Sequence, residues 1–231
     1  MKSAARFIAW TIAALAAAFL AFQVSYLVRI LWWKTHNPTT TAFMEASLER
    51  LRTTKPDAKL RHQWVEYEKI SSHLKRAIVA SEDAKFTDHE GFDWEEIEKA
   101  KAKNKEKGKV VRGASTISQQ LAKNLFLSGD RSMWRKGQEA LITVMIENAM
   151  DKRRILEIYL NVIEWGDGVY GAEAAARHYY GRSAAALDAE GAARLAAMVP
   201  NPRFYDRHRN TAWLRKKTDL ILARMSSAEV P

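Results

Sequence analysis

The sequence predicts an all-α protein, and three observations support this prediction. Apolar residues recur at helical spacing in several segments, for example Leu74, Ala77 and Ile78 within His73–Ala80. No stretch alternates apolar and polar residues for long enough to predict a strand, and no internal repeat is visible. Hydrophobic residues make up 47% of the chain and charged residues 28%, a balance typical of folded proteins.

Length and charge limit the function classes. At 231 residues the chain has room for one sizeable domain and an appendage. A net charge of +10 favours an anionic partner, which could be nucleic acid, an acidic lipid surface or a phosphate-bearing substrate. The chain has no cysteine, which excludes disulfide bonds and thiolate metal sites.

The first element is the apolar run Phe7–Val28, which has the length needed to span a bilayer. Trp10, Tyr26, Trp32 and Trp33 lie near its ends, where interfacial aromatic residues are common. The run is longer than the apolar core of a cleaved signal peptide, so we expect a retained anchor. Basic residues flank both ends, and charge therefore does not fix the topology.

The next segment predicts a linker and a short amphipathic helix near the membrane. Pro38 and the three threonines after it favour an extended chain, whereas Phe43, Leu48 and Leu51 are interleaved with charged residues. Lys55–His62 is polar and predicts a connection.

The most informative stretch is Ser81–Asp93 (SEDAKFTDHEGFD). A carboxylate at the end of a buried helix, beside like charge and aromatic rings, is expected to have a raised pKa and to suit general acid–base catalysis. The alternative is a solvated acidic helix end. Asp93 is predicted to cap a helix over Trp94–Ala102. Ionisable side chains crowd the stretch, among them Glu82, Asp83, Lys85, Asp88 and His89.

Two polar segments follow. Lys99–Arg112 is basic and lacks an apolar stripe, so we interpret it as a mobile surface loop or as a basic flap over an anion site. Gly113–Asn124 (GASTISQQLAKN) predicts a helix on which Ser115, Gln119 and Lys123 share one face. That face could bind sugar hydroxyls and phosphate oxygens, or it could simply be hydrated.

Arg131–Met150 predicts a long helix with Ser132 near its start. Arg131, Arg135 and Glu139 fall at i, i+4 and i+8 on one face. This row is either ion pairing along the surface or a pyrophosphate clamp with a second carboxylate beside it, and the spacing does not choose. Four further helices are predicted over Asp151–Asn161, Ala172–Tyr180, Leu187–Met198 and Asn210–Met225.

Five blocks of the sequence, in order, resemble the peptidoglycan glycosyltransferase family, and most closely its monofunctional, membrane-anchored members. With the segment NPTTTAFM they cover residues 37–202. The blocks are EDAKFTDHEGFD (Glu82–Asp93), GASTISQQLAKN (Gly113–Asn124), RKGQE (Arg135–Glu139), KRRILEIYLN (Lys152–Asn161) and EGAARLAAMVPNP (Glu190–Pro202).

The resemblance implies a lysozyme-like all-α glycosyltransferase domain (34–231) with a small membrane-associated jaw. A cytoplasmic N-terminus and one transmembrane helix (1–33) would anchor it in the bacterial inner membrane, with the catalytic domain in the periplasm. The implied reaction is polymerisation of lipid II into β-1,4 glycan strands with release of undecaprenyl pyrophosphate, without transpeptidase activity. Since the donor is α-linked and the product β-linked, one inverting displacement suffices.

The resemblance also implies roles for single residues. Glu82 matches the general base, and Glu139 matches the second glutamate, which assists the departing pyrophosphate directly or through a divalent cation (Mg²⁺ or Mn²⁺). Lys123, Arg131 and Arg135 match the donor-side cations. No organic cofactor is expected. The other residues expected to bind substrate are Asp83, Lys85, Phe86, His89, Gly113, Ser115, Thr116, Gln119, Gln120, Asn124 and Lys136.

The expected partners are lipid II, the growing glycan strand and the membrane, with proteins of cell-wall synthesis or division as further candidates and no nucleic acid. A glycan hydrolase is the nearest alternative, but it needs no basic row for pyrophosphate. A membrane-tethered anion-binding protein needs no catalytic carboxylates, and no nucleic-acid-binding motif is visible. Ser72–Lys75 matches S-x-x-K, but the partner motifs of a transpeptidase are missing.

Overall fold

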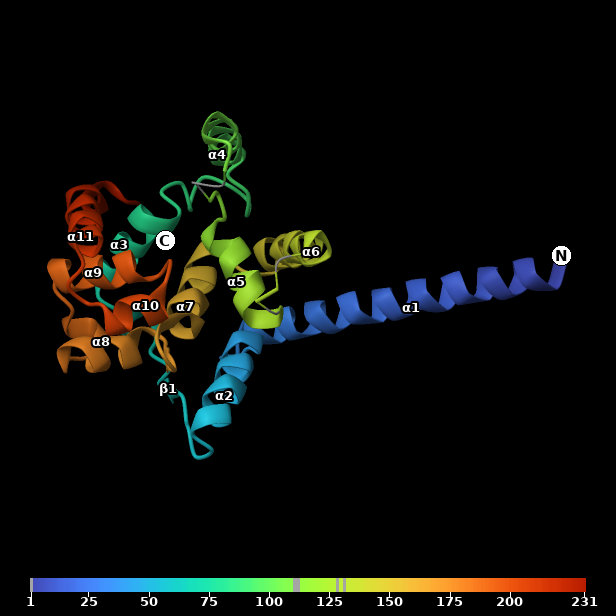
Figure 1. Cartoon of the computed structure of the whole chain (residues 1–231), viewed down its shortest axis with the longest axis horizontal. Helices are drawn as coiled ribbons and strands as arrows, with labels where there is room; N and C mark the ends of the chain where they lie inside the picture. The colour runs from blue at the N-terminus through green and yellow to red at the C-terminus, as the bar shows by residue number, and fades with distance from the viewer. Residues whose placement is uncertain (1, 110–112, 128, 131) are drawn as a thin grey trace.

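In the computed structural model a long N-terminal helix projects from a body of packed helices (Figure 1). The structure describes residues 2–109, 113–127, 129, 130 and 132–231. Most of these residues are helical, which confirms the all-α prediction. Short 3₁₀ turns lie at Tyr67–Lys69, Ala184–Ala186 and Met225–Ser227. The α-helices are α1 (Lys2–Trp33), α2 (Ala42–Thr54), α3 (Ser72–Glu82), α4 (Trp94–Lys107), α5 (Ile117–Phe126), α6 (Met133–Ala149), α7 (Lys152–Val162), α8 (Ala172–Tyr180), α9 (Ala189–Met198), α10 (Pro202–Arg207) and α11 (Ala212–Arg224).

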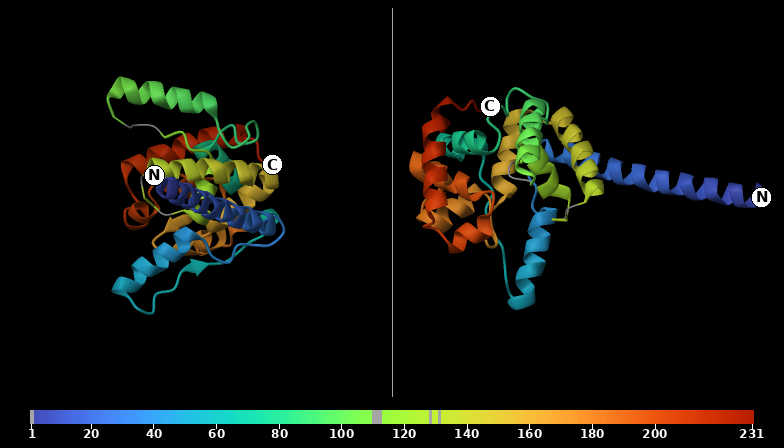
Figure 2. Two further views of the ribbon diagram at one scale, coloured as in Figure 1. Left: turned by 90° about the vertical axis from the view of Figure 1, so that its right-hand side faces the viewer. Right: turned by 45° about the horizontal axis from the view of Figure 1, so that its top comes forward.

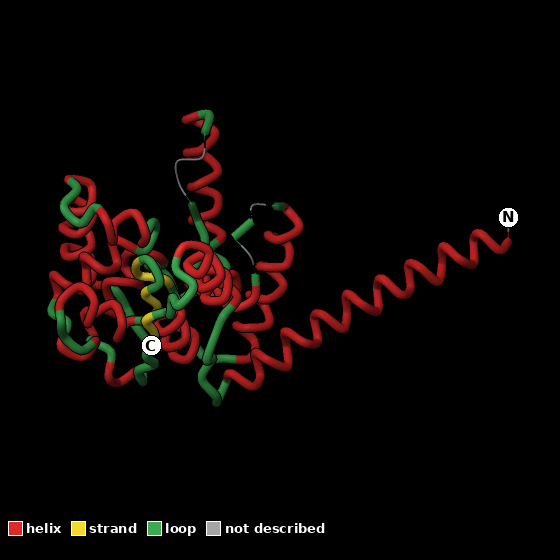
Figure 3. The backbone as a smooth tube through the Cα atoms, turned by 60° about the horizontal axis from the view of Figure 1, so that its bottom comes forward, coloured by secondary structure: helices red, strands yellow, loops and turns green. Residues whose placement is uncertain are grey.

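A small three-stranded sheet was not expected from the sequence. It has the order β1–β3–β2, with β1 (Arg61–His62) parallel to β3 (Val169–Tyr170) and β2 (Glu164–Gly166) antiparallel to β3. The strands lie among the helices of the body (Figure 3). Segments of two or three residues are too short to show a period-2 pattern, which explains why the sequence did not reveal them.

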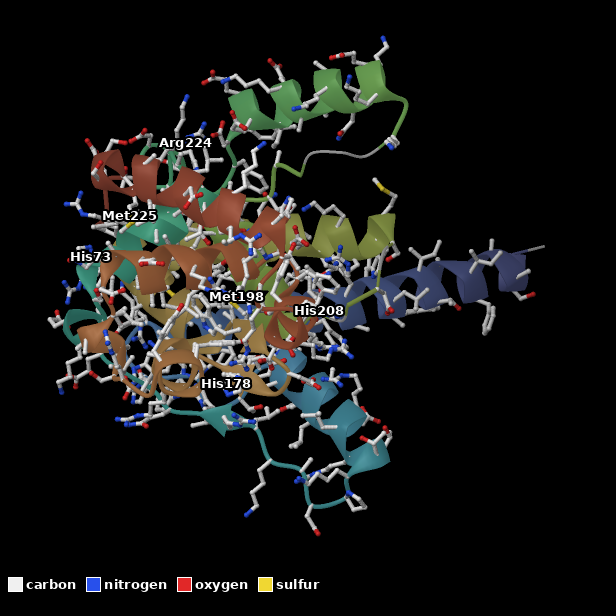
Figure 4. All side chains as sticks on the ribbon, turned by 60° about the vertical axis from the view of Figure 1, so that its left-hand side comes forward. His73, His178, Met198, His208, Arg224 and Met225 are labelled. Atoms are coloured by element: carbon white, nitrogen blue, oxygen red, sulfur yellow. The ribbon has the colours of Figure 1, made fainter. Side chains whose placement is uncertain are left out.

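The part of the body that contains α3, α9 and α11 is built around α9. Its residues Ala192, Ala193, Ala196 and Ala197 are fully buried, and these small side chains let α3 and α11 pack closely against it. Figure 4 labels Met198 at the end of α9, which is part of the same core. Since Glu82 is the last residue of α3, this core fixes its position.

α4 stands apart from the body in Figure 1 and in the left view of Figure 2. The sequence predicted a helix that ends at Ala102 and a loop or flap over Lys99–Arg112. That boundary was wrong, because the helix continues to Lys107 and ends at Gly108, which has a left-handed φ of 63°. Lysine and glutamate favour helix even without an apolar stripe, so the composition indicated an exposed helix. Residues 110–112 lie outside the described residues.

α1 is the single helix of the described chain that is long and apolar enough to cross a membrane. At roughly 1.5 Å per residue it is about 48 Å long, whereas a hydrocarbon core is about 30 Å thick. Its C-terminal part therefore reaches the body, where it packs against α6 and where Ile30 is fully buried in the core.

Arg154 of α7 fixes the junction between α1 and α2. Its guanidinium donates to the carbonyl oxygens of Trp33 (3.0 Å) and His36 (2.6 Å). It also donates to Asn37 Oδ1 at 2.9 Å and to Glu157 Oε2 at 2.7 Å. The predicted linker is thus short, and Arg154 fixes it to α7. Residues on both sides of the expected 33/34 domain boundary are hydrogen-bonded to this one side chain.

Candidate active site

Glu82 lies at the C-terminal end of α3, surrounded by protein but partly open to solvent. Its Oε1 accepts a hydrogen bond from Ser81 Oγ at 3.0 Å, and its Oε2 accepts one from Gln120 Nε2 at 3.0 Å. Burial raises the pKa of Glu82, while these two bonds and the positive charge of Lys217 oppose the rise. A carboxylate with a raised pKa is suited to take up a proton.

Gln120 is in turn oriented by Tyr159 of α7. The Tyr159 hydroxyl donates to Gln120 Oε1 at 2.9 Å, which turns the amide nitrogen of Gln120 toward Glu82. Burial, together with the nearby charge of Glu82, raises the pKa of Tyr159 well above its usual value, so the hydroxyl remains a donor. The three side chains form one hydrogen-bonded row that ends on the carboxylate of Glu82.

Asp83 and His89 lie behind Glu82. Asp83 is buried, and its two oxygens accept from His89 Nε2 at 2.9 Å and from the backbone N–H of Ile117 at 3.0 Å. The Gly91 N–H donates to His89 Nδ1 at 3.1 Å, which assigns the ring proton to Nε2. This pair joins the end of α3 to the start of α5. These bonds give Asp83 and His89 a supporting role, and the expected contact of the two residues with substrate stays a prediction.

The start of α5 differs from the prediction. Thr116 and Gln119 form a reciprocal capping box, so α5 begins at Ile117 and not at Gly113. Ser115 consequently lies before the helix, and the predicted shared face of Ser115, Gln119 and Lys123 is wrong. The T-x-x-Q spacing of a capping box was visible in the sequence.

Four further residues that are expected to bind substrate lie inside the protein. Thr116, Gln119, Phe86 and Asn124 are buried, and the Asn124 amide donates to the carbonyl oxygen of Gln120 at 2.7 Å. These contacts give the four side chains a structural role, and their expected contact with substrate stays a prediction. Ser115 and Gly113 are exposed at the edge of the site. Lys85 is exposed and pairs with Glu95 of α4.

A cationic cluster forms where α5 meets α6. Lys123 comes from α5, and Arg135, Lys136 and Glu139 come from α6. Burial lowers the pKa of Lys123, and Arg135 and Lys136 lower it further, whereas Glu139 and Glu82 oppose the decrease. Lys123 thus lies within electrostatic reach of both carboxylates. Arg131, the remaining predicted cation, lies outside the described residues.

Within this cluster both carboxylate oxygens of Glu139 accept hydrogen bonds from cationic side chains. Arg135 Nη1 donates to Glu139 Oε2 at 2.7 Å, Lys136 Nζ donates to Glu139 Oε1, and Lys136 also approaches Ser115 Oγ at 3.4 Å. The surface-pairing and clamp interpretations of the Arg135–Glu139 row are therefore not exclusive. The pair exists, and it orients Arg135 beside Lys123.

In this structure Glu139 has no free carboxylate oxygen for a divalent cation. Both carboxylate oxygens already bind cationic side chains, and a metal ion would have to displace one of them. No group of three His, Asp or Glu side chains in the described ranges is placed to hold a metal.

Sequence reasoning missed Lys217 of α11, whose charge acts on Glu82 from a helix that follows the last recognised block. The side chain is partly buried. The only signal for α11 was a basic amphipathic helix, which does not distinguish Lys217 from the neighbouring exposed Lys216.

The chain belongs to the transglycosylase family, because the family model described as Transglycosylase matches residues 48–226. This confirms the resemblance, the lysozyme-like fold and the class of enzyme, a glycosyltransferase. The chain is 60% identical over 231 residues to the biosynthetic peptidoglycan transglycosylase of Herminiimonas arsenicoxydans, covering 100% of both chains. It is 63% identical over 220 residues to the protein of the same name from Laribacter hongkongensis, covering 95% of this chain and 96% of that one.

Proposed function

We propose that this chain is a membrane-anchored peptidoglycan glycosyltransferase that polymerises lipid II into β-1,4 glycan strands and releases undecaprenyl pyrophosphate. The observation that carries the proposal is the pairing of Glu82, a carboxylate with a raised pKa, with a cluster of cationic side chains on α5 and α6. A base on one side and cations on the other are what inverting transfer from a pyrophosphate donor requires.

In the proposed step, Glu82 accepts the proton of the acceptor's 4-hydroxyl while that oxygen attacks C1 of the donor. The new C1–O4 bond forms as the bond between C1 and the pyrophosphate oxygen breaks, and the electron pair leaves with the pyrophosphate. Lys123, Arg135 and Lys136 stabilise the charge that develops there, since charge-assisted hydrogen bonds are about twice as strong as neutral ones. Glu139 keeps Arg135 and Lys136 in position, and no step is assigned to a metal.

The proposed location is the inner membrane, with the catalytic domain in the periplasm. α1 supplies a helix of spanning length, and α6, which packs against it, exposes large apolar side chains. Met133 is 86% exposed and Trp134 is 69% exposed, and Leu141 and Val144 are also exposed. An apolar surface of this kind is suited to lie in the membrane interface, as expected for the jaw.

A transpeptidase activity is not part of the proposal. Lys75 of the S-x-x-K match is buried, and its Nζ lies 3.9 Å from the centre of the Tyr67 ring, where it packs on the ring face. Ser72 is exposed at the start of α3. This arrangement favours a structural role for Lys75.

The test of the proposal is polymerisation of purified lipid II by the full chain and by Glu82→Gln. The substituted amide can still accept a hydrogen bond from Gln120 but cannot take up the proton, so we expect the rate to fall about a hundredfold or more. A Glu82→Gln enzyme with near wild-type turnover would remove Glu82 from the mechanism. Release of muropeptides from finished glycan strands, without lipid II, would instead identify a hydrolase.

The clamp is tested separately with Arg135→Ala and Arg135→Lys. Both should weaken binding of a phosphoglycolipid inhibitor that mimics the donor, since an ammonium group cannot reproduce a guanidinium fork. Because Glu139 is buried, loss of the Arg135 partner should also lower the melting temperature, although Lys136 still binds Glu139, so inhibitor affinity is measured well below the melting temperature of each variant. Unchanged inhibitor affinity in both variants would contradict the clamp.

A further inference from the structure

A cavity of about 420 Å³ lies between the membrane helix α1 and the body, beside α5 and α6. Phe19, Phe22 and Tyr26 of α1 form one wall, and Phe126 and Trp134 form the other. The Phe19 and Trp134 rings are 5.9 Å apart, and the Tyr26 and Phe126 rings are 5.0 Å apart. The anchor is thus one wall of an aromatic-lined cavity and not only a tether.

The other end of the cavity is polar. Gln23 Nε2 donates to Gln138 Oε1 at 2.9 Å, which joins α1 to α6. Gln23 is 9% exposed, and neither its Oε1 nor Arg135 Nε has a hydrogen-bond partner among the described residues. Asp130 and Ser132 also line this end. Buried polar atoms without partners are rare in folded proteins, and two of them beside one cavity point to a ligand that supplies the missing bonds.

The depth of the cavity indicates what kind of ligand this is. Gln23 precedes Val28, the end of the apolar run, by five residues, which is about 8 Å along the helix. The aromatic walls therefore lie at the level of the outer hydrocarbon region, and Arg135 lies at the cationic cluster of the proposed active site. A ligand that fits both ends carries an apolar chain that ends directly in a phosphate.

We propose that this cavity binds the phosphate-proximal isoprene units of the polyprenyl chain of the donor, with Arg135 at the phosphate end. The inference rests on the proposed function and adds to it a subsite built partly from the anchor. A single chain joined directly to phosphate can follow the cavity into the cationic cluster. A phospholipid instead carries two chains on a glycerol that separates them from its phosphate.

The expected effect is modest for a physical reason. The chain moves from lipid into protein and not from water, so packing and the two polar bonds contribute, and the hydrophobic effect does not. We therefore expect loss of one wall to change donor recognition by about threefold to tenfold, which corresponds to at most about 1.4 kcal/mol.

The kinetic test uses the full-length enzyme in vesicles and two donors, one with a full polyprenyl chain and one cut to a single isoprene unit. Phe19→Ala removes part of the aromatic wall, and Gln23→Leu removes the bond to Gln138. Phe7→Ala is the matched control, since Phe7 is 73% exposed on the same helix and is far from the cavity in sequence. In the two cavity variants the preference in kcat/KM for the long donor should fall about threefold to tenfold, with no such change in Phe7→Ala. Equal preferences in all three variants would overturn the proposal.

A second measurement does not depend on turnover. A polyprenyl phosphate with a photoreactive group near the phosphate should label residues 19–26 of α1 or the first turns of α6, and excess phosphatidylglycerol should not compete. Labelling confined to residues near Phe7, or displacement by phosphatidylglycerol, would identify general lipid contact and overturn the proposal. If the wild-type enzyme polymerises neither donor, the proposed function fails, and the labelling still decides whether the cavity binds polyprenyl phosphate.

Discussion

Replacement of Tyr159 with phenylalanine removes one hydroxyl from behind Glu82. This hydroxyl donates to Gln120 Oε1 at 2.9 Å, and Tyr159 is fully buried. The loss of a neutral hydrogen bond costs about 1 kcal/mol, and the unpaired carbonyl of Gln120 brings the cost to about 1–3 kcal/mol. The hydroxyl also keeps the Gln120 amide nitrogen toward Glu82. Without it the amide carbonyl can turn toward the carboxylate, which disfavours the ionised form and raises the pKa of Glu82 further.

Two measurements on Tyr159→Phe test this reasoning. The melting temperature should fall, by about 2–4 °C for each kcal/mol in a chain of this size. The acid limb of kcat/KM should move to higher pH, because a base with a higher pKa becomes ionised only at higher pH. Tyr170→Phe is the control, since Tyr170 is also fully buried and its hydroxyl donates to the carbonyl oxygen of Phe43 at 3.1 Å. If both variants lose the same stability and neither shifts the acid limb, the positioning role of Tyr159 is refuted.

Three further predictions concern charge and backbone strain. Lys217→Ala removes a positive charge that lowers the pKa of Glu82, so the acid limb should move to higher pH at low ionic strength, whereas exposed Lys216→Ala should leave it in place. Glu82→Gln should raise the melting temperature at neutral pH, because burial raises the pKa of this carboxyl and the stability of its protonated form is lost as the pH rises through that pKa. The gain should disappear in acid, and a gain that persists there would contradict it. Gly91→Ala should destabilise the fold by about 1–3 kcal/mol, because φ is 88° and a Cβ would lie 2.7 Å from a methyl carbon on α6. Gly108→Ala, which has a left-handed φ but open space, measures the strain alone, and equal melting temperatures for the two glycine variants would exclude the clash.

The helices followed from the sequence wherever an apolar stripe faces the core. α8 begins and ends at the predicted residues, and α7, α9 and α11 do so to within about two residues. α10, with six residues, and the two- and three-residue strands are shorter than the repeat on which such predictions rest. In α4 a helical segment was instead interpreted as a loop, because it contains many lysines, although the intrinsic preference of lysine is for helix.

The sequence predicted which charged residues form the candidate site, but it did not predict how the polar side chains around them are oriented. The sequence placed Glu82, Lys123 and Arg135 on different helices, and the structure brings Glu82 and Arg135 each into electrostatic reach of Lys123. The sequence could not show which polar side chains point into the protein, because helix capping and hydrogen bonds to neighbouring elements decide this. Gln119, which caps α5, is an example. Lys217 reaches the site through tertiary packing of α11 against α3 and α9, which a local pattern does not encode.

The four hydrogen bonds of Arg154 have a mechanical consequence. Three of them join Trp33, the last residue of α1, and the following residues His36 and Asn37 to α7, which couples the orientation of α1 to that of the body. A body that is joined to α1 in this way cannot change its height or tilt over the bilayer unless α1 tilts with it. Under the proposed membrane anchoring, the tilt of α1 would then set the angle of the body to the membrane surface, and a change in bilayer thickness that alters this tilt would also reorient the body.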